Sequence, residues 1–250
     1  MRRLMILHIP HSSRIIPEEV RDQFVLSDDE LDAELTRMTD AFTDELFAFP
    51  DTTTVRFPIS RLVVDVERFA DDAKEVMAKK GMGVVYTRTA HGKKLRRELR
   101  PHEREDLISR FYDTHHEELR EAVRDELKRY GRAFIIDGHS FPSWPLPCDM
   151  DQSTPRPEFC VGTDPFHTPE ALAQVAIRQL EKTGYSVKEN SPFDGVLVPI
   201  AFYREDQRVA SIMVEVNRSL YMDEETGART SGFGRTKEYV QTLLRSLSVF

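Results

Sequence analysis

The chain has 250 residues, 40% of them hydrophobic and 31% charged, which is typical of a globular protein with one large domain or two small ones. No apolar run approaches the ~18 residues of a membrane span, and nothing at the N-terminus resembles a signal peptide. The net charge of −8 argues against a general nucleic-acid binder. Two cysteines are too few for a disulfide framework, so we expect a cytoplasmic protein.

The first predicted element is a buried strand, because residues 4–9 form a short apolar run. Pro10-His11-Ser12-Ser13 follows it as a turn, so this stretch carries two imidazoles, His8 and His11. α/β enzymes present their chemistry where such strands end, at the carboxyl edge of the sheet. We therefore expect other functional groups to converge on these two histidines.

The next predicted element is one continuous helix. Ser27 and Glu30 match a capping box, and Pro50 ends the pattern. Between them, apolar residues recur at helical spacing: Leu31, Leu35, Met38, Phe42, Leu46 and Phe49. A short β-rich strand is predicted at residues 52–57.

The middle of the chain predicts further alternation of strands and helices. Residues 59–68 and 84–87 read as strands, and residues 70–82 as a helix. Residues 103–130 predict a long amphipathic helix that ends at Gly131. His115 and His116 lie early on this helix, where adjacent side chains point about 100° apart. We expect at most one of them to face inward, and we predict that this one is His116.

A second buried strand, residues 133–136, leads into Asp137-Gly138-His139-Ser140 and so repeats the opening pattern. The proline-rich loop 141–157 is long enough to form a rim or lid. Strands are predicted at 159–162, 196–199 and 211–218, and helices at 169–182 and 237–247. Since there is no repeat or linker, we expect residues 1–250 to form a single α/β domain.

His8, His11 and His139 are candidate metal ligands. Neutral imidazole is the commonest ligand at catalytic zinc sites, where three protein groups leave a fourth position for water. Histidines buried for structural reasons are also common, and a His-x-x-His spacing alone does not separate the two possibilities.

Glu215, Asp65 and Asp137 are candidate carboxylates of the site. Glu215 lies in an apolar run, so its carboxylate must pair with a cation, bind a metal or have a raised pKa. A general base needs such a setting, and an ion pair with Arg218 is the alternative. Asp65 and Asp137 could bind the metal directly, but we favour their orienting a ligating histidine.

Five motifs in this order, spanning almost the whole chain, make the sequence resemble the N-formylglutamate amidohydrolases. They are Pro10-His11-Ser12-Ser13, Ser60-Arg61-x3-Asp65-x-Glu67-Arg68, Asp137-x-His139-Ser140, Asn190-x-Pro192-Phe193-x-Gly195 and Glu215-Val216-Asn217-Arg218. The family looks like a distant relative of zinc carboxypeptidases and aspartoacylases. This implies an α/β fold of the phosphorylase/hydrolase-like, zinc carboxypeptidase-like type, with a mixed central sheet and helices on both faces.

The resemblance also implies roles for individual residues. His11 and His139 would bind one zinc ion, Asp65 would support His11, and Glu215 would be the general base and acid. The relatives keep a third ligand, a glutamate, three residues after the first histidine, where this chain has Arg14. The third ligand is therefore expected to be His8 or Asp65. A second departure is Glu67, at a position where the family usually has asparagine.

The implied reaction is hydrolysis of the N-formyl amide of N-formyl-L-glutamate, or of another small anionic N-acyl amino acid. N-formyl-L-glutamate has two carboxylates, which several arginine and amide side chains could bind, because guanidinium pairs bidentately with carboxylate. The expected substrate-binding residues are Arg61, Arg68, Asn217 and Arg218. Asp137 and His116 are expected to contact the residues of the site and hold them in place, without binding the metal or the substrate themselves. The alternatives are a small-peptide hydrolase and a metal-free binder of acidic ligands, and no feature predicts an oligomeric state.

Overall fold

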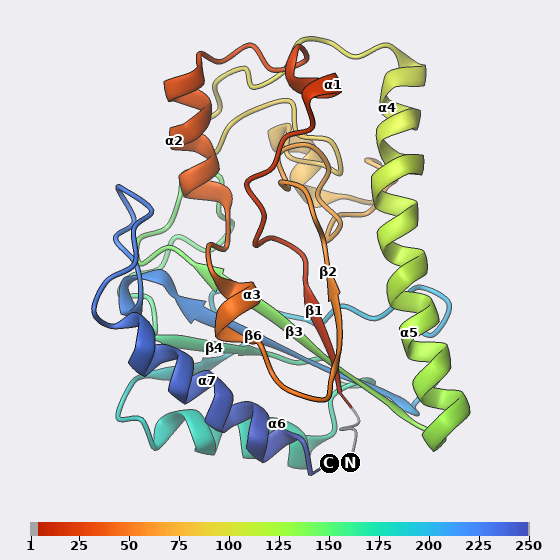
Figure 1. Cartoon of the computed structure of the whole chain (residues 1–250), viewed down its shortest axis with the longest axis vertical. Helices are drawn as coiled ribbons and strands as arrows, with labels where there is room; N and C mark the ends of the chain where they lie inside the picture. Colours follow the sequence, from red (N-terminus) through yellow and green to blue (C-terminus); the bar gives the residue numbers. More distant parts are fainter. Residues whose placement is uncertain (1–4, 250) are drawn as a thin grey trace.

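The computed structural model describes residues 5–249, so Leu4, expected to begin the first strand, lies outside the described residues. Six strands form one mixed sheet in the order β2-β1-β3-β6-β4-β5 (Figure 1). The first four in this order are parallel, whereas β4 is antiparallel to β6 and parallel to β5. Their bounds are β1 Ile6–Ile9, β2 Thr53–Arg56, β3 Ala133–Phe141, β4 Phe159–Gly162, β5 Val187–Glu189 and β6 Val209–Asn217.

Helices cover both faces of this sheet, as expected (Figure 1). Helix α5 packs on one face, and α3, α6 and α7 pack on the other. No helix among residues 5–249 is long and apolar enough to cross a bilayer. The α-helices are α1 Glu18–Arg21, α2 Asp28–Met38, α3 Thr43–Leu46, α4 Pro101–Leu107, α5 Thr114–Tyr130, α6 Glu170–Glu181 and α7 Phe233–Leu247.

The alternation of side chains along the strands decides which groups face α5. Ile6 and Ile135 pair in register and pack against α5, whereas Leu7 and Ile136 pack against the helices of the opposite face. Side chains two residues further along point the same way as Ile6 and Ile135. His8 and Asp137, and then His139 and Glu215, therefore form two register pairs on the α5 face.

Residues 57–96, here called the irregular layer, lie beyond the sheet edge and pack against α2 and α4. The strands predicted at 59–68 and 84–87 are wrong, because this segment consists of turns. The helix predicted at 70–82 is also wrong, apart from the 3-10 helix η1, Val76–Lys80. The apolar runs are nevertheless fully buried, with their partners in α2 and α4 rather than in a neighbouring strand. The strand predicted at 196–199 is also a loop.

The two long predicted helices had different outcomes. The helix predicted at 103–130 is confirmed as α4 and α5, joined without a break by the π-helical turn η2, Ile108–Asp113. Gly131 ends it with a left-handed φ of 74°. The helix predicted from Ser27 to Phe49 is broken instead. Thr39 is extended and Phe42 has a φ of 66°, so Asp40 lies in a loop between α2 and α3.

Candidate metal centre and active site

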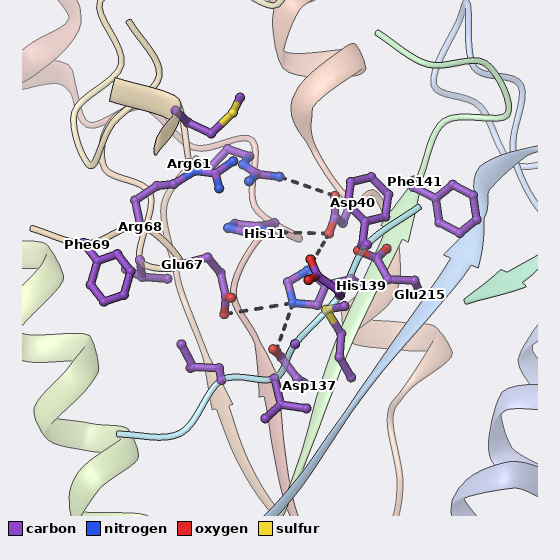
Figure 2. Close-up of a pocket in the computed structure, with 18 of the residues that line it drawn as sticks. His11, Asp40, Arg61, Glu67, Arg68, Phe69, Asp137, His139, Phe141 and Glu215 are labelled. Carbon is purple, nitrogen blue, oxygen red and sulfur yellow. Dashed lines mark hydrogen bonds and ion pairs between the residues drawn. The ribbon is translucent and has the colours of Figure 1, made fainter. Parts of the chain in front are cut away.

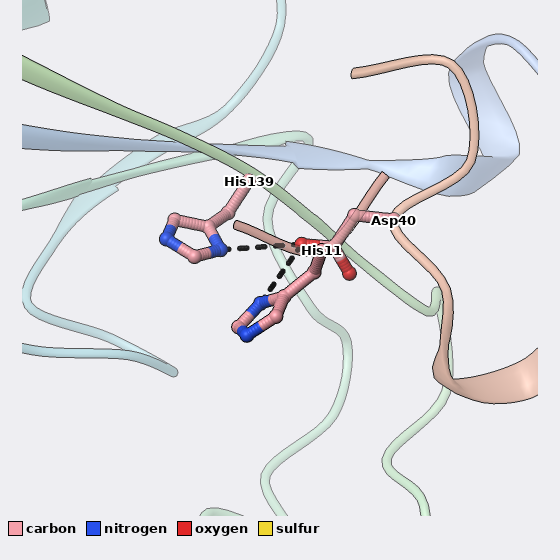
Figure 3. A group of neighbouring side chains, drawn as sticks. All are labelled: His11, Asp40 and His139. Atoms are coloured by element: carbon pink, nitrogen blue, oxygen red, sulfur yellow. Dashed lines mark hydrogen bonds and ion pairs between the residues drawn. The ribbon is translucent and has the colours of Figure 1, made fainter. Parts of the chain in front are cut away.

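Three buried side chains meet at the carboxyl ends of β1 and β3 (Figures 2 and 3). His139 Nδ1 lies 3.2 Å from Asp40 Oδ2, and His11 Nδ1 lies 3.7 Å from the same oxygen. A tetrahedral zinc ion holds each ligand atom at about 2.0–2.1 Å, which separates neighbouring ligand atoms by about 3.3 Å. The spacing of His11, Asp40 and His139 therefore fits a single zinc ion.

Both histidines have a carboxylate on the ring nitrogen that faces away from this group. His11 Nε2 lies 2.9 Å from Asp65 Oδ1, and His139 Nε2 lies 3.0 Å from Asp137 Oδ1. At His11 the carboxylate accepts the Nε2 hydrogen, which leaves the Nδ1 lone pair free to bind a metal. Nδ1 of His11 is buried without a hydrogen-bond partner among the described residues, as the fit to a metal requires.

Asp40 is the member of this group that the sequence analysis missed. The unbroken apolar spacing from Leu31 to Phe49 concealed the loop that carries it. The only available signal was local: Asp40 and Thr43 are helix-capping residue types, and the Thr43 hydroxyl donates to the Asp40 carbonyl at the start of α3. The Asp40 amide also donates to the His11 carbonyl at 2.9 Å, which ties this loop to the end of β1.

The ionisation of Asp40 follows from its neighbours. Burial alone would raise its pKa, but the nearby imidazoles of His11 and His139 and the charge of Arg218 hold that pKa well below its usual range. Arg218 donates from Nη2 to Asp40 Oδ1 at 2.8 Å. Asp40 is therefore an anion, which is the form that binds a metal.

The two residues expected to supply the third ligand lie elsewhere. His8 is fully buried, with Nδ1 2.8 Å from Asp137 Oδ1 and Nε2 2.8 Å from His115 Nε2. Burial lowers the pKa of His8, so it is neutral. Asp65 contacts His11 on the nitrogen that faces away from Asp40 and His139. Neither side chain enters the group formed by His11, Asp40 and His139.

Glu215 lies beside this group, paired in register with His139 on the adjacent strand. Its side chain lines the cavity, and its Oε2 is buried with no hydrogen-bond partner in the described part of the chain. Burial raises the pKa of Glu215 to about 7, against the opposing charge of His139. Arg218, the alternative partner, bonds instead to Asp40, Ser140 and the Arg37 carbonyl.

The four expected substrate-binding residues differ in how free they are. Arg61 donates two hydrogen bonds to Asp65 Oδ2, at 2.7 and 3.1 Å, and Arg218 is held by Asp40. Asn217 donates to the Pro157 carbonyl and does not line the cavity. Arg68 lines the cavity. Its Nε has no hydrogen-bond partner among residues 5–249 and lies 3.6 Å from Asp65. Arg68 is the freest of the four.

Both histidines early on α5 point into the protein, so the expectation that at most one faces inward was wrong. His115 reaches the sheet and contacts His8, whereas His116 lines the cavity with its Nε2 2.9 Å from the Val66 carbonyl. They lie at different depths, at the start of α5 directly after the π-helical turn. Burial lowers the pKa of His116 to about 4, so it is neutral.

The comparisons with known proteins agree with this architecture. The sequence profile of the N-formylglutamate amidohydrolase family matches residues 4–222. The chain belongs to this family. The crystal structure of N-formylglutamate amidohydrolase from Ralstonia eutropha JMP134 is similar, with a TM-score of 0.86 and 25% identity over 99% of this chain and 93% of that one. The protein is therefore an amidohydrolase with the α/β fold of that family.

A second solved structure shares the fold alone. A gene product from Agrobacterium tumefaciens has a TM-score of 0.64 and 19% identity, over 98% of this chain and 92% of that one. No curated protein matches the chain.

The charge balance of the amidohydrolase site is consistent with a divalent cation. Five carboxyl groups and three guanidiniums gather around His11 and His139. With both imidazoles neutral, as metal binding requires, full ionisation of these groups leaves two negative charges in excess, which one divalent ion balances. Burial and the charge of Asp137 raise the pKa of Glu67 well above its usual range. The carboxyl groups are Asp40, Asp65, Glu67, Asp137 and Glu215, and the guanidiniums are Arg61, Arg68 and Arg218.

Proposed function

We propose that this amidohydrolase uses one divalent metal ion, zinc, to hydrolyse the N-formyl amide of N-formyl-L-glutamate or of a related N-acyl amino acid. The observation that carries the proposal is the group of His11, Asp40 and His139 beside Glu215, with a carboxylate behind each histidine. Two histidines and one carboxylate are a ligand set typical of catalytic zinc. The charge balance supports a single ion over two, although His8, Glu67 and Asp137 also lie within metal-binding distance of one another.

The chain's own groups divide the chemistry among them. A bound zinc ion supplies a Lewis acid that brings the pKa of water to about 7 and polarises the amide carbonyl. Glu215 takes the proton of the attacking water and returns it to the amide nitrogen as the C–N bond breaks. The products are formate and the free amino acid. A pKa of about 7 suits both proton transfers, since a base and acid works best near ambient pH.

Substrate placement follows from the groups that remain free. Arg68 is proposed to bind the α-carboxylate of the amino acid, because it lines the cavity and its Nε lacks a partner. Arg61 and Arg218 are proposed to act indirectly, by holding Asp65 and Asp40 in place. This pairing also disfavours a metal-free binder of acidic ligands, because such a binder would need those guanidiniums free.

Two matched variants test the proposal. Glu215→Gln should keep zinc affinity within about threefold of the parent but lower kcat by about 10²–10⁴-fold, as expected for loss of a general base. Asp40→Asn should lose more than about 100-fold in zinc affinity, beyond the effect of residues that only orient ligands. Zinc affinity is measured by chelator competition, and kcat with N-formyl, N-acetyl and N-succinyl amino acids.

Either of two results would refute the proposal. One is full turnover by Glu215→Gln, which would remove the assigned base. The other is a protein that contains no zinc when purified and gains no activity when zinc is added.

A further inference from the structure

The cavity in front of Glu215 has apolar walls as well as the polar floor described above. Its volume is about 830 Å³, in the upper part of the range for small-molecule sites. Its apolar lining comes from separate segments and includes Phe69, Met77, Met82, Met150, Phe193 and Ile200. A substrate that only presents carboxylates would leave these walls unused.

Three of these side chains are large and exposed to solvent. Phe69 is 55% exposed, Met150 67% and Ile200 79%, and they come from the irregular layer and from two different loops. Exposed apolar side chains that gather around a cavity indicate a binding surface, because their solvation is unfavourable until something covers them. In Figure 2, Phe69 and Arg68 lie on one side of the pocket and Glu215 on the other, with the two metal-centre histidines between them.

The cations that line the cavity are mostly paired already. Arg61 and Arg218 bond to aspartates of the metal centre. Arg37 pairs with Glu34, and Arg120 pairs with Glu117. Arg68, with its nearest carboxylate oxygen at 3.6 Å, is left as the loosely held guanidinium among the described lining residues. The cavity therefore provides for one substrate carboxylate.

The remaining charges on the cavity wall are negative. Asp113, Asp151 and Asp194 line the cavity, and none of them has an ion pair within 4 Å among residues 5–249. A second carboxylate on a substrate would lie near these groups, and the other guanidiniums of the lining already pair with carboxylates of the chain. Like charges placed together are a common means of excluding the wrong ligand.

We infer that the substrate is an N-formyl or N-acyl amino acid with an uncharged, apolar side chain. Its α-carboxylate binds Arg68, its amide lies between Glu215 and the metal centre, and its side chain packs against Phe69, Met150 and Ile200. The inference rests on the proposed function and narrows its substrate class. The reaction is unchanged: water adds to the acyl carbon, the C–N bond breaks, and the amine leaves with the proton from Glu215.

A series of three substrates tests the inference on the zinc-loaded enzyme. N-formyl-L-glutamine matches N-formyl-L-glutamate in size and lacks only the second charge, and N-formyl-L-methionine is apolar at similar length. We expect kcat/KM to rise about tenfold from glutamate to glutamine and about tenfold again to methionine, since one group in an apolar site changes kcat/KM by roughly 10–200-fold. A kcat/KM for the glutamate derivative equal to or above both others would overturn the inference. Hydrolysis of none of the three would instead overturn the proposed reaction and, with it, this inference.

A pair of variants tests the apolar wall itself. Phe69→Ala should lower kcat/KM for N-formyl-L-methionine about tenfold and leave that for N-formyl-L-alanine within about twofold. Val76→Ala is the matched control, because Val76 is 60% exposed, lies in the same layer and does not line the cavity. It should change neither value. An equal loss for both substrates in Phe69→Ala, or no loss for either, would contradict the assigned contact.

Discussion

The sheet and the irregular layer deliver side chains to the same site by different physical means. In the sheet, the alternation of a strand sets the direction of Asp137, His139 and Glu215, and the ladder of backbone hydrogen bonds holds them. In the irregular layer, Asp65 and Arg68 lie in turns that form no ladder. Their position depends on isolated turn hydrogen bonds, such as that from the Asp65 amide to the Val84 carbonyl at 2.8 Å, and on contacts of side chains with the backbone and with one another.

In the irregular layer, the Arg96 side chain makes several hydrogen bonds to backbone carbonyls. It is 1% exposed and donates to the carbonyls of Leu62, Val63 and Tyr86, at 2.8, 3.1 and 3.1 Å, and to Gln23. Burial lowers its pKa to about 10. Buried carbonyls need a donor, and here a guanidinium takes the place of a neighbouring strand. An apolar run can therefore be fully buried without being a strand.

The largest expected effect comes from removing this guanidinium. Arg96→Met should lower the free energy of unfolding by about 4 kcal/mol, because three buried carbonyls lose their donor at about 1–3 kcal/mol each, partly offset by removal of a buried charge. Urea unfolding monitored by fluorescence and circular dichroism measures this.

Arg97→Met provides the control for Arg96→Met. Arg97 is the next residue, and its side chain is 35% exposed in an ion pair with Glu103. Its loss should lower the free energy of unfolding far less than loss of Arg96, because exposed ion pairs contribute little to stability. Equal losses for the two variants would mean that Arg96 does not hold the irregular layer together.

The next largest effect concerns Glu215 in the sheet, and it is a change in how the stability of the metal-free protein depends on pH. Folding raises the pKa of Glu215 from 4.5 to about 7, so between these values the folded state keeps a proton that the unfolded state has lost. The free energy of unfolding should therefore fall as pH rises from 4.5 to 7, by about 3 kcal/mol for this group. Glu215→Gln should lack this contribution, and the comparison is made by urea unfolding at several pH values. If the free energy of unfolding changed with pH in the same way in the parent protein and in Glu215→Gln, the raised pKa of Glu215 would be contradicted.

These two regions also explain what the sequence could and could not predict. Apolar runs that carry His, Asp or Glu predicted the strands β1, β3 and β6, because strand alternation is a local property. Asp65 was correctly placed near His11, but its segment was predicted as a strand, since nothing in residues 59–68 indicates a donor from Arg96. Asp40 was missed because the break after α2 depends on tertiary contacts, such as the bond from its amide to the His11 carbonyl.

The smallest expected effect compares the two carboxylates that orient the histidines, one from each region. Asp137→Asn in the sheet and Asp65→Asn in the irregular layer should each lower zinc affinity by about 10–100-fold, since each removes a negative charge within 3.0 Å of Nε2 of a proposed histidine ligand. Chelator competition measures both. Asp71→Asn is the control, because Asp71 lies in the irregular layer with its side chain 56% exposed, and it should not change zinc affinity.

The two variants should differ in stability even where their zinc affinities agree. Asp65 also accepts hydrogen bonds from Arg61 and Tyr86, so Asp65→Asn loosens the irregular layer. Asp137 also contacts His8, but the ladder of its strand holds its backbone whatever the charge of its side chain. We therefore expect thermal unfolding of the metal-free protein to shift more for Asp65→Asn than for Asp137→Asn. If zinc affinity fell in only one of the two variants, the aspartate replaced in the other variant would not orient its neighbouring histidine. If the stability losses were equal, the irregular layer would not depend on side-chain contacts more than the sheet does.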